Sequence, residues 1–550
     1  MTNKEIAAAF RQLGQLMELH QDNPFKIKSY QNAYRKLRKL EEPLAEMSVM
    51  EIGAIPGVGK AISGKIQELT AEGKMATLEK WKAQTPSGVV EMLEIGGFGP
   101  KKIRSIWKDL GVESIGELLY AVNENRLVEL KGFGAKTQAD LKQKLEFFLK
   151  SSGQYHFRTL EAPANELLEI LQKAHGEKEQ SALTGAIRRL CPVLQEITIL
   201  TTANPELCLS ENEDFVVLHE ADDQIKGSFQ EYPVTIYRCA AEAWGSKQFR
   251  YTASPDFMAA FLAKFPDLDF KDLPTETAVF AKVNLPYIAP ELRENEWGLQ
   301  LAAENNLPEL LEEASIRGVV HSHSTYSDGI NTLADMAAAA KQLGYEYLLI
   351  TDHSKSAFYA NGLKEDRLRE QWAEIDVLNA SLAPFRILKG IESDILNDGS
   401  LDYSDDILAE FDVVIASVHS NLRMDEAKAT QRLLTAIANP YTHILGHPTG
   451  RLLLSRAGYP IDHKAIIDAC AEHRVCIELN ANPMRLDLDW SWIPYAIERG
   501  VPISINPDAH SVGGIQDVRY GVLAARKGGL TEKLCLNTRS ITEFLAWFKG

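Results

Sequence analysis

The sequence lacks the features that mark membrane-spanning chains, secreted chains and disulfide-bonded scaffolds. No apolar stretch among its 550 residues approaches the roughly 20 residues that cross a bilayer. Its six cysteines include no C-x-x-C pair, which indicates reduced thiols. The first residues, MTNKEIAAAF, lack the basic-then-apolar pattern of a signal peptide. We therefore expect a cytoplasmic protein without membrane contact, and we expect it to be a monomer.

The chain also lacks a general excess of positive charge. Its net charge is −17, and its length predicts three or four domains. Residues 1–150 carry 23 Lys and Arg against 19 Asp and Glu, whereas the remaining residues carry 36 against 57. An acidic body binds polyanions poorly, so we expect any contact with nucleic acid to be local and led by the N-terminal part.

Three segments of that N-terminal part repeat one pattern: an apolar residue, a G-x-G turn, a lysine and a helical run. They read IPGVGKAISGKI, IGGFGPKKIRSI and LKGFGAKTQADL. Glycines let the backbone approach a ligand, and the N–H groups that begin the next helix can bind a phosphate oxygen. One copy would be equally consistent with a glycine-capped helix-turn-helix, but three copies favour phosphate-backbone binding. The candidate residues are Gly57, Gly59, Lys60, Gly97, Gly99, Lys101, Gly132, Gly134 and Lys136.

Seven apolar runs after residue 316 each end in residues of metal-ligand type. They are RGVVHSH, YEYLLITDH, RILKGIE, VVIASVH, HILGH, VCIELN and VPISINPDAH. Each run predicts a buried strand followed by a helix, and a closed parallel sheet would gather all the strand ends on one rim. The runs therefore predict a polynuclear metal site, with candidates His321, His323, Asp352, His353, Glu392, His419, His447, Glu478, Asn480, Asp508 and His510.

Residues 317–550 resemble a PHP (polymerase and histidinol phosphatase) domain through HSHSTYSDG, TDHS, GIESDIL, ASVHS, GHPTGRLL, ELNANPMRLDL and DAHS. The resemblance implies a distorted (βα)7 barrel with three divalent metal ions. Its implied ligands are His321, His323, Glu392 and Asp508 for the first ion, Glu392, His419 and His447 for the second, and Asp328, His353 and His510 for the third. Such ligands suit Zn²⁺, Mn²⁺ or Fe²⁺, and we expect Mn²⁺ to support activity.

Four further residues of this region are candidates for supporting roles. We expect Glu478 and Asn480 to orient a ligand histidine, as carboxylates and amides around metal sites often do. Arg451 and Arg485 are candidates for binding a substrate phosphate.

The three glycine-turn segments resemble helix-hairpin-helix motifs, which hold DNA through its backbone. NPFKIKSYQNAYRKL and the first hairpin together resemble the small N-terminal domain of family X DNA polymerases. In relatives with 5′-deoxyribose-phosphate lyase activity, a lysine of the hairpin's second helix forms a Schiff base. Lys65 matches that position, with Tyr34 as a neighbour. The alternative for Lys65 is an exposed helix lysine without catalytic function, because a Schiff-base lysine must be partly desolvated.

Residues 154–290 resemble a nucleotidyltransferase palm that has lost its carboxylates. TGAIRRLCPVLQEITILTT matches the family's Gly-Ser turn and the strand with two aspartates, and YPVTIYR matches the strand with the third. The three acidic positions hold Glu196, Thr198 and Thr235. Two-metal phosphoryl transfer needs several carboxylates, so this chain is expected not to polymerise. The alternative is that acidic residues of SENEDF serve instead.

The order of these parts resembles that of bacterial PolX proteins, and the resemblance implies the domains and the function that follow. We expect an all-α helix-hairpin-helix region in two parts (1–85 and 86–150), an α+β palm-like domain (151–290), a linker (291–316) and an α/β PHP barrel (317–550). The predicted function is metal-dependent 3′→5′ DNA exonuclease activity in DNA repair, with abasic-site or 3′-end processing as related reactions. An active family X polymerase and a histidinol-phosphatase-like enzyme remain alternatives; a non-catalytic DNA-binding scaffold would require damaged ligands, and the motifs are intact.

Overall fold

The computed structural model describes residues 1–40, 42–95, 99–128, 130, 133–150, 153–173, 179–205, 209 and 212–549. The chain forms two compact units, Met1–Leu149 and Lys150–Gly550. Among the described residues, none of the helices is long and apolar enough to cross a membrane.

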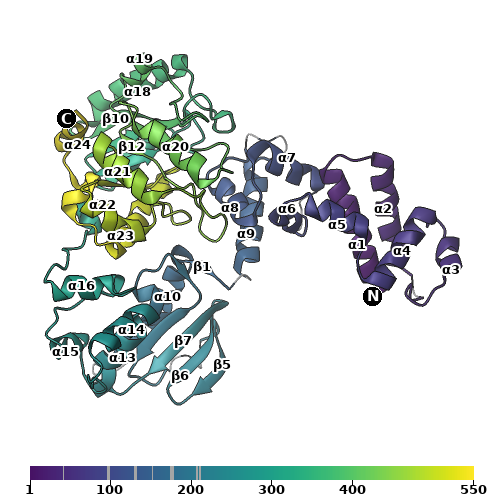
Figure 1. Ribbon diagram of the computed structural model, residues 1–550, viewed down its shortest axis with the longest axis horizontal. Helices are drawn as coiled ribbons and strands as arrows, with labels where there is room; N and C mark the ends of the chain where they lie inside the picture. The colour runs from purple at the N-terminus through teal and green to yellow at the C-terminus, as the bar shows by residue number, and fades with distance from the viewer. Residues whose placement is uncertain are drawn as a thin grey trace. The chain divides into compact units, whose positions relative to one another are not determined.

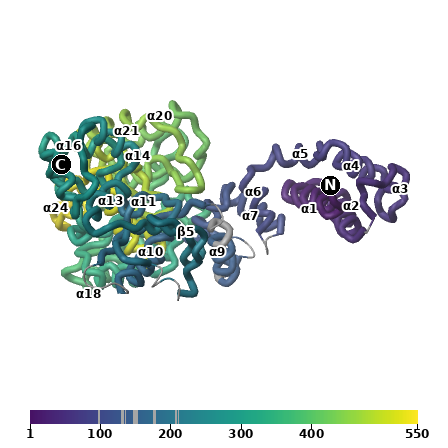
Figure 2. Tube along the Cα trace, turned by 90° about the horizontal axis from the view of Figure 1, so that it is seen from below, coloured from purple at the N-terminus to yellow at the C-terminus, as the bar shows by residue number. Residues whose placement is uncertain are grey.

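The first unit is helical throughout its described residues. Its helices are α1 (Asn3–Leu19), α2 (Pro24–Leu37), α3 (Val49–Ala54), α4 (Lys60–Glu72), α5 (Ala76–Ala83), α6 (Ser87–Met92), α7 (Pro100–Leu110), α8 (Ile115–Asn123) and α9 (Ala135–Lys150). A capping box between Thr2 and Glu5 begins α1, whose buried Phe10 ring lies 6.1 Å from that of Tyr30 on α2. The two helices lie side by side in both views (Figure 1, Figure 2).

The second unit begins with a mixed sheet. Its strands are β2 (Ser181–Leu183), β4 (Ile197–Thr201), β5 (Phe215–Ala221), β6 (Gln224–Phe229) and β7 (Tyr232–Arg238), in the order β2-β4-β7-β6-β5. β4 and β7 are parallel, and their neighbours are antiparallel. Every residue of β4 is buried, and α10 (Phe157–Lys173) covers the same core with Leu160, Leu167 and Leu171. This is the α+β layout that the sequence predicts.

A second small core follows the sheet. It joins α13 (Trp244–Thr252), α14 (Pro255–Lys264), α15 (Glu276–Ala281) and α16 (Trp297–Ala303). Phe249, Phe257, Phe261 and Phe280 are fully buried in it. The stretch predicted as a linker contains α16, whose Leu299 belongs to this core.

The rest of the chain is a parallel barrel. Its strands are β8 (Gly318–Ser322), β9 (Tyr347–Ile350), β10 (Arg386–Asp394), β11 (Val413–Ser417), β12 (Ile444–Leu445), β13 (Cys476–Asn480) and β14 (Ile503–Asn506), hydrogen-bonded in chain order. A parallel bridge between Ser322 and Ala509 brings the last strand back to the first. All seven predicted runs form strands, so the expected multidomain fold with a nearly closed barrel is confirmed.

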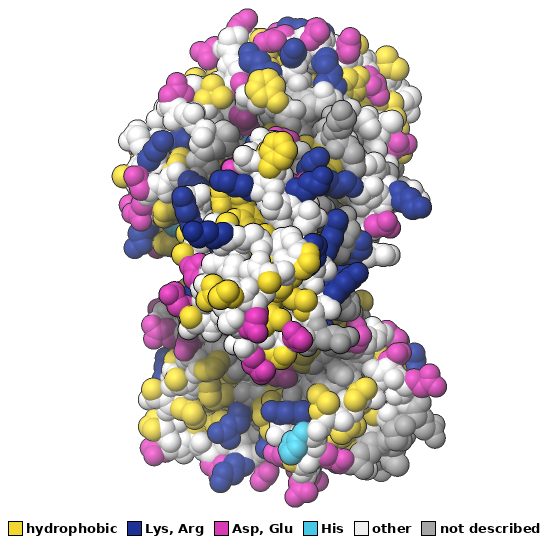
Figure 3. Space-filling model, turned by 90° about the vertical axis from the view of Figure 1, so that its right-hand side faces the viewer, with side chains coloured by type: hydrophobic (Ala, Val, Ile, Leu, Met, Phe, Trp, Pro, Cys, Tyr) yellow, Lys and Arg dark blue, Asp and Glu magenta, His cyan; other side chains and the backbone are white. Residues whose placement is uncertain are grey.

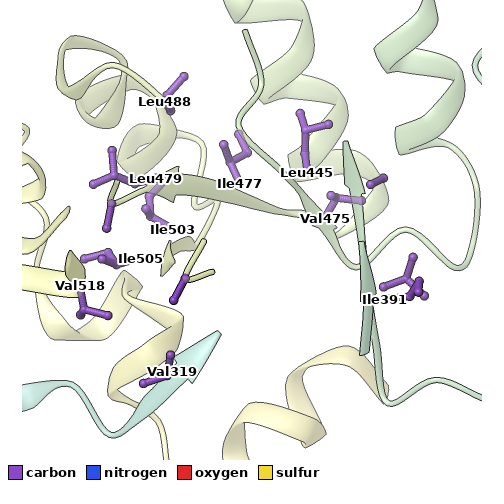
Figure 4. Close-up of a cluster of buried hydrophobic side chains, with 14 of the residues drawn as sticks. Val319, Ile391, Leu445, Val475, Ile477, Leu479, Leu488, Ile503, Ile505 and Val518 are labelled. Carbon is purple, nitrogen blue, oxygen red and sulfur yellow. The ribbon is translucent and has the colours of Figure 1, made fainter. Parts of the chain in front are cut away.

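Helices follow most of these strands: α17 (Leu333–Gln342), α18 (Glu365–Leu382), α19 (Asp405–Leu408), α20 (Glu426–Ile437), α21 (His463–His473), α22 (Ile493–Glu498), α23 (Val518–Lys527) and α24 (Ile541–Lys549) (Figure 1). Successive strand residues enter different cores. Val319 and Ile391 pack in the larger cluster with helix residues such as Val518 (Figure 4). Val320 and Leu388 pack in a smaller cluster with Phe544. Strands buried on both faces are typical of parallel barrels, which explains their continuous apolar runs.

Hydrogen bonds and ion pairs of α23 connect the barrel to the part of the same unit that contains the mixed sheet. Lys527 is 1% exposed, and its Nζ donates to Arg189 O at 2.7 Å and to Glu294 Oε1 at 2.6 Å. Arg519 binds both carboxylate oxygens of Glu161 through its two terminal nitrogens. A buried charge that loses its partner is costly, so this interface depends on each member being present.

We expect Lys527→Ala to lower the free energy of unfolding of the 150–550 unit by about 3 kcal/mol, because the buried ammonium group would be lost and Glu294, whose side chain is 16% exposed, would keep fewer partners. Urea unfolding followed by circular dichroism measures the effect. Lys173→Ala removes an ion pair whose side chains are 77% and 64% exposed, and serves as the control with a change below about 0.5 kcal/mol. Equal effects of the two variants would contradict the interpretation.

Candidate metal centre

The nine predicted ligands lie at or after the carboxyl ends of the barrel strands. They follow β8 (His321, His323, Asp328), β9 (His353), β10 (Glu392), β11 (His419), β12 (His447) and β14 (Asp508, His510). Three of them have left-handed backbones, with φ of 68° at His321, 21° at His447 and 52° at Asp508. Residues other than glycine rarely adopt this region, and such strain concentrates at functional sites.

Glu392 is the centre of the cluster. Its Oε1 lies 3.3 Å from Nε2 of His321, 3.1 Å from Nε2 of His419 and 3.0 Å from Nε2 of His447. Its Oε2 lies 3.0 Å from Nδ1 of His353 and 3.7 Å from Nε2 of His323. One carboxylate thus meets five imidazoles from four strand ends.

Two aspartates extend the cluster on the side of His323. Asp508 Oδ1 lies 3.4 Å from Nε2 of His321 and 3.1 Å from Nε2 of His323. Asp328 lies 3.5 Å from Nε2 of His353 and 3.3 Å from Nε2 of His510. The whole set is thereby connected through its three carboxylates.

Three overlapping groups of ligand atoms are compact enough to hold one ion each. They are His321 with His323 and Asp508, His353 with Glu392 and His419, and His323 with Asp328, His353 and His510. The grouping differs from the implied one in three ways: Glu392 is absent from the first group, His353 takes the place of His447 beside Glu392 and His419, and His323 joins the third group.

The chemistry of the donors fits divalent metal ions. Nε2 of His321, both ring nitrogens of His353 and Oε2 of Glu392 are buried and make no hydrogen bond within the described part of the chain. Buried polar atoms without hydrogen-bond partners are rare. Several such atoms that converge on one point indicate a binding site for a positively charged ligand. A cation bound to these nitrogen and oxygen atoms would satisfy them.

Electrostatics of the protein alone point the same way. Burial disfavours the charged imidazole of His321, but the carboxylates of Glu478, Asp508 and Glu392 outweigh burial and hold its pKa well above the usual value. Burial disfavours protonation of His353, whereas the carboxylates of Asp328 and Glu392 favour it. The carboxylates outweigh burial and raise the pKa of His353 to about 10. The site therefore attracts positive charge, which protons supply when metal is absent.

Glu478 supports two ligands from behind. It accepts a hydrogen bond from Nδ1 of His321 at 2.6 Å and one from the backbone N–H of His447 at 3.0 Å. The side-chain amides of Asn506 and Asn480 donate to it at 2.7 and 2.9 Å. Nε2 of His321 is thereby directed toward Glu392 and Asp508, as a supporting carboxylate does in metal sites.

Asp394 supports His419 in the same way, and sequence reasoning missed it. Its Oδ1 accepts from Nδ1 of His419 at 2.5 Å. Glu392 and Asp394 lie two residues apart on β10, so they share one face of the strand. That spacing in GIESDIL was the signal available.

Asp352, a candidate at the sequence level, acts on the loop that carries Asp328. It accepts hydrogen bonds from the backbone N–H and hydroxyl groups of Ser324 and Ser327, and from the amide of Gln371 at 2.6 Å. These contacts use both oxygens, so Asp352 positions the loop.

The two candidate phosphate-binding arginines have different environments. Arg485 is buried, with Nε 3.9 Å from Asp508 Oδ2, beside the cluster. Arg451 instead binds Arg485 O at 3.0 Å through Nε, together with Leu486 O and the Asp489 carboxylate. Arg451 thus holds the backbone of the segment that carries Arg485.

In the N-terminal unit, the described glycines and lysines of the three repeats lie where one helix gives way to the next. Gly57 has φ of 85° between α3 and α4, Gly59 and Gly99 cap α4 and α7, and Gly134 precedes α9. Gly97 and Gly132 lie outside the described residues. The lysines are exposed in the first turns: Lys60, Lys101 and Lys136. Figure 3 shows Lys and Arg side chains interspersed with acidic ones on the face that it displays.

Lys65 lies on α4 and is half-buried, and its Nζ donates to Thr77 Oγ1 at 2.6 Å. Tyr34, its expected neighbour, lies on α2, where its hydroxyl accepts from Arg38 at 3.2 Å. That contact lowers the pKa of Tyr34.

In the sheet, the three positions matched to polymerase carboxylates are close together. Thr198 and Thr235 are directly opposite each other in the parallel pair β4–β7. Thr198 Oγ1 donates to Thr184 O at 2.7 Å, and Thr235 Oγ1 donates to Glu196 Oε2 at 2.7 Å. Both hydroxyls are therefore engaged within the protein.

The fold and site define a class of protein that joins helix-hairpin-helix units to a PHP barrel. A helix-hairpin-helix domain family matches residues 1–75, a SAM-like helix-hairpin-helix tandem family matches residues 89–146, and the PHP domain family matches residues 320–482. The DNA polymerase/3′-5′ exonuclease PolX of Bacillus subtilis is 36% identical over 100% of both chains. The chain therefore belongs to the PolX family.

The barrel alone has shorter relatives. A probable phosphatase of Thermoanaerobacter sp. is 30% identical over 40% of this chain and 89% of its own length. The probable phosphatase YcdX of Escherichia coli is 32% identical over 29% of this chain and 62% of its own.

Glu478→Gln is expected to weaken Mn²⁺ binding about 10- to 100-fold, because a neutral amide orients His321 and raises its basicity less than a carboxylate does. Isothermal titration calorimetry on the metal-stripped protein measures the change. Glu410→Gln, at an exposed ion pair with Arg369 on the same barrel, is the matched control. An affinity equal to that of the unmodified protein would exclude this orienting role.

Metal affinity is expected to increase with pH. Binding requires neutral imidazoles, and His321 and His353 have raised pKa values in the metal-free protein, so each ion must displace protons. We expect the Mn²⁺ association constant to rise at least about tenfold per unit between about pH 6 and about pH 8. Calorimetry in buffers of different ionisation enthalpy counts the released protons, and a count of zero would contradict the expectation.

Proposed function

We propose that this chain is a metal-dependent DNA phosphodiesterase that removes nucleotides from 3′ ends and acts in DNA repair in the cytoplasm. The single observation that carries the proposal is the convergence of nine residues with nitrogen or oxygen donors, eight of them buried, on one barrel rim, in a chain related over its full length to a PolX protein. Abasic-site cleavage and 3′-end cleaning are related reactions of the same site. The proposed domain boundaries are those expected from the sequence, except that the stretch 291–316 contains α16, which packs in the core of α13, α14 and α15.

We propose three divalent ions, of Zn²⁺, Mn²⁺ or Fe²⁺ type, with the nine ligands named above. Bound ions would supply an ionised water and neutralise charge on the phosphate. Glu392 can bridge two ions because both of its oxygens face imidazoles. Arg485, buried beside Asp508, is placed to bind a non-bridging phosphate oxygen.

Loss of polymerase activity is supported by the sheet. Only Glu196 among the three matched positions is a carboxylate, and it already accepts a hydrogen bond from Thr235. A Cβ on Gly185 would lie 2.5 Å from Thr198 Oγ1, so the turn at residue 185 is closed against the position of a missing aspartate. A neutral hydroxyl directed to Thr184 O holds no Mg²⁺.

Arg188, which follows the turn at residue 185, is also neutralised by a carboxylate. Both terminal nitrogens of Arg188 bind the Glu276 carboxylate at 3.0 and 2.5 Å. The alternative carboxylates of SENEDF include Glu213 and Asp214, which are exposed at the start of the edge strand β5, and β6 separates that strand from β7. Neither observation favours nucleotide transfer.

We propose that the helix-hairpin-helix segments hold gapped, primed or single-stranded DNA without regard to sequence. Lysines are exposed at the starts of α4, α7 and α9, and the N-terminal N–H groups of α4 and α7 receive no hydrogen bond from a capping side chain, which suits phosphate oxygens. Lyase activity of Lys65 is a weaker candidate, favoured only by its half-burial and by its contact with Thr77.

A second candidate function, hydrolysis of small phosphate monoesters, is favoured by the barrel's similarity to probable phosphatases. It accounts for the metal ligands but gives no role to the helix-hairpin-helix units. A third candidate function, template-dependent DNA synthesis, is suggested by the Bacillus subtilis relative, a DNA polymerase/3′-5′ exonuclease.

One experiment separates the three. A 5′-labelled primer on a gapped template is incubated with Mn²⁺, with and without dNTPs, and analysed on a denaturing gel beside an assay of histidinol phosphate hydrolysis. A ladder of shorter products that dNTPs do not change supports the exonuclease. Longer products would show that the chain polymerises in spite of Glu196, Thr198 and Thr235 at the three matched positions. Hydrolysis of the monoester without a ladder would favour the phosphatase.

His323→Ala is expected to abolish the ladder, because His323 lies between Asp508, Glu392 and Asp328. Binding of the same DNA, measured by fluorescence anisotropy, is expected to change by less than about twofold, since phosphate contacts by the N-terminal unit are untouched. His473→Ala, at an exposed histidine of α21, is the control. Full hydrolysis by His323→Ala would refute the site assignment.

A further inference from the structure

An exposed aromatic ring stands on the loop that follows a predicted metal ligand. The rim loop, residues 354–363, begins directly after His353 and leads to α18. Its Phe358 is 86% exposed, the largest exposed fraction among the large hydrophobic side chains of the described residues. A single exposed hydrophobic side chain is common on protein surfaces, so what distinguishes Phe358 is its place on a loop that begins at a predicted metal ligand.

The rim loop is rigidly anchored on both sides of that ring. Ala357 and Ala360 are fully buried, and the backbone N–H of Leu363 donates to His353 O at 2.9 Å. A Cβ on Gly362 would lie 1.9 Å from Ser354 O, so the two ends of the loop are in contact. Phe358 is thus exposed because the loop holds it there.

The same anchoring connects the rim loop to the metal centre. Ser356 Oγ donates to Asp394 Oδ2 at 2.7 Å, and Asp394 in turn orients His419. The ring of Tyr359 lies 6.1 Å from that of His353, centroid to centroid. The loop that carries Phe358 is therefore in contact with the metal centre.

We propose that Phe358 is a stacking platform for the nucleobase of the nucleotide whose phosphate is hydrolysed. Every base has an apolar π face, so a single aromatic ring holds any 3′-terminal nucleotide without reading its sequence. Phe358 is a positioning residue that acts through the base. The inference rests on the proposed function, because it takes DNA as the substrate.

The test compares single-stranded oligonucleotides that end in a normal 3′ nucleotide or in a 3′ abasic tetrahydrofuran residue, with the full chain and Mn²⁺. Phe358→Ala is expected to raise KM for the normal end about 5- to 100-fold and to leave kcat within about threefold. For the abasic end, the unmodified protein and Phe358→Ala are expected to have equal KM values. Phe358→Trp is expected to restore the normal KM, and Phe358→Leu to restore it only in part.

Val377→Ala is the matched control, because Val377 is 72% exposed on α18 in the half that runs from the rim toward the start of β10. Melting temperature and Mn²⁺ affinity are expected to be equal in all variants, since neither side chain is buried. Failure of the unmodified protein to shorten either oligonucleotide would overturn the proposed function itself. A ladder with an unchanged KM for Phe358→Ala, or an equal rise on the abasic end, would overturn the stacking role alone.

Discussion

The structure is organised around the burial of one carboxylate among five imidazoles. Glu392 is 1% exposed, and burial alone would make its ionised form costly. The surrounding histidines reverse that cost and hold the pKa of Glu392 well below its usual value, His419 contributing most and then His321 and His353. A buried glutamate without these histidines would destabilise the fold, so the strand ends that carry them must meet.

The barrel supplies that convergence by ordinary β geometry. On β10, Leu388 packs in the cluster that contains Val320 and Phe544. Glu392 and Asp394 lie four and six residues later and therefore on the same face of the strand. On β13, Cys476 lies in the same cluster and Glu478 continues its face. Apolar residues thus fill one end of the barrel, and ligands with their supports fill the other. The strained backbones at His321, His447 and Asp508 redirect side chains where the regular alternation ends.

Much of this could be predicted from the sequence, because each strand is a short apolar run with a polar ending. The seven strands, their order and the clustering of ligands follow from that pattern and the rules of parallel sheets. Asp328 does not end such a run, and only the resemblance to PHP domains pointed to it. Asp394 was missed because its function depends on a partner, His419, that lies 25 residues away. The different environments of Arg451 and Arg485 likewise depend on a local backbone conformation, which the spacing of residues in the sequence does not predict.

The ion pairs of α23 join the barrel to the part of the unit that contains the mixed sheet. Arg519, Arg526 and Lys527 all bind acidic residues outside the barrel, and α23 begins a few residues after His510. Lys527 is so deeply enclosed that the barrel on its own would carry an unmatched charge on its surface helix. Removal of the sheet-containing part would therefore leave charged groups of α23 without partners and would destabilise the barrel, whether or not that part has a catalytic activity of its own.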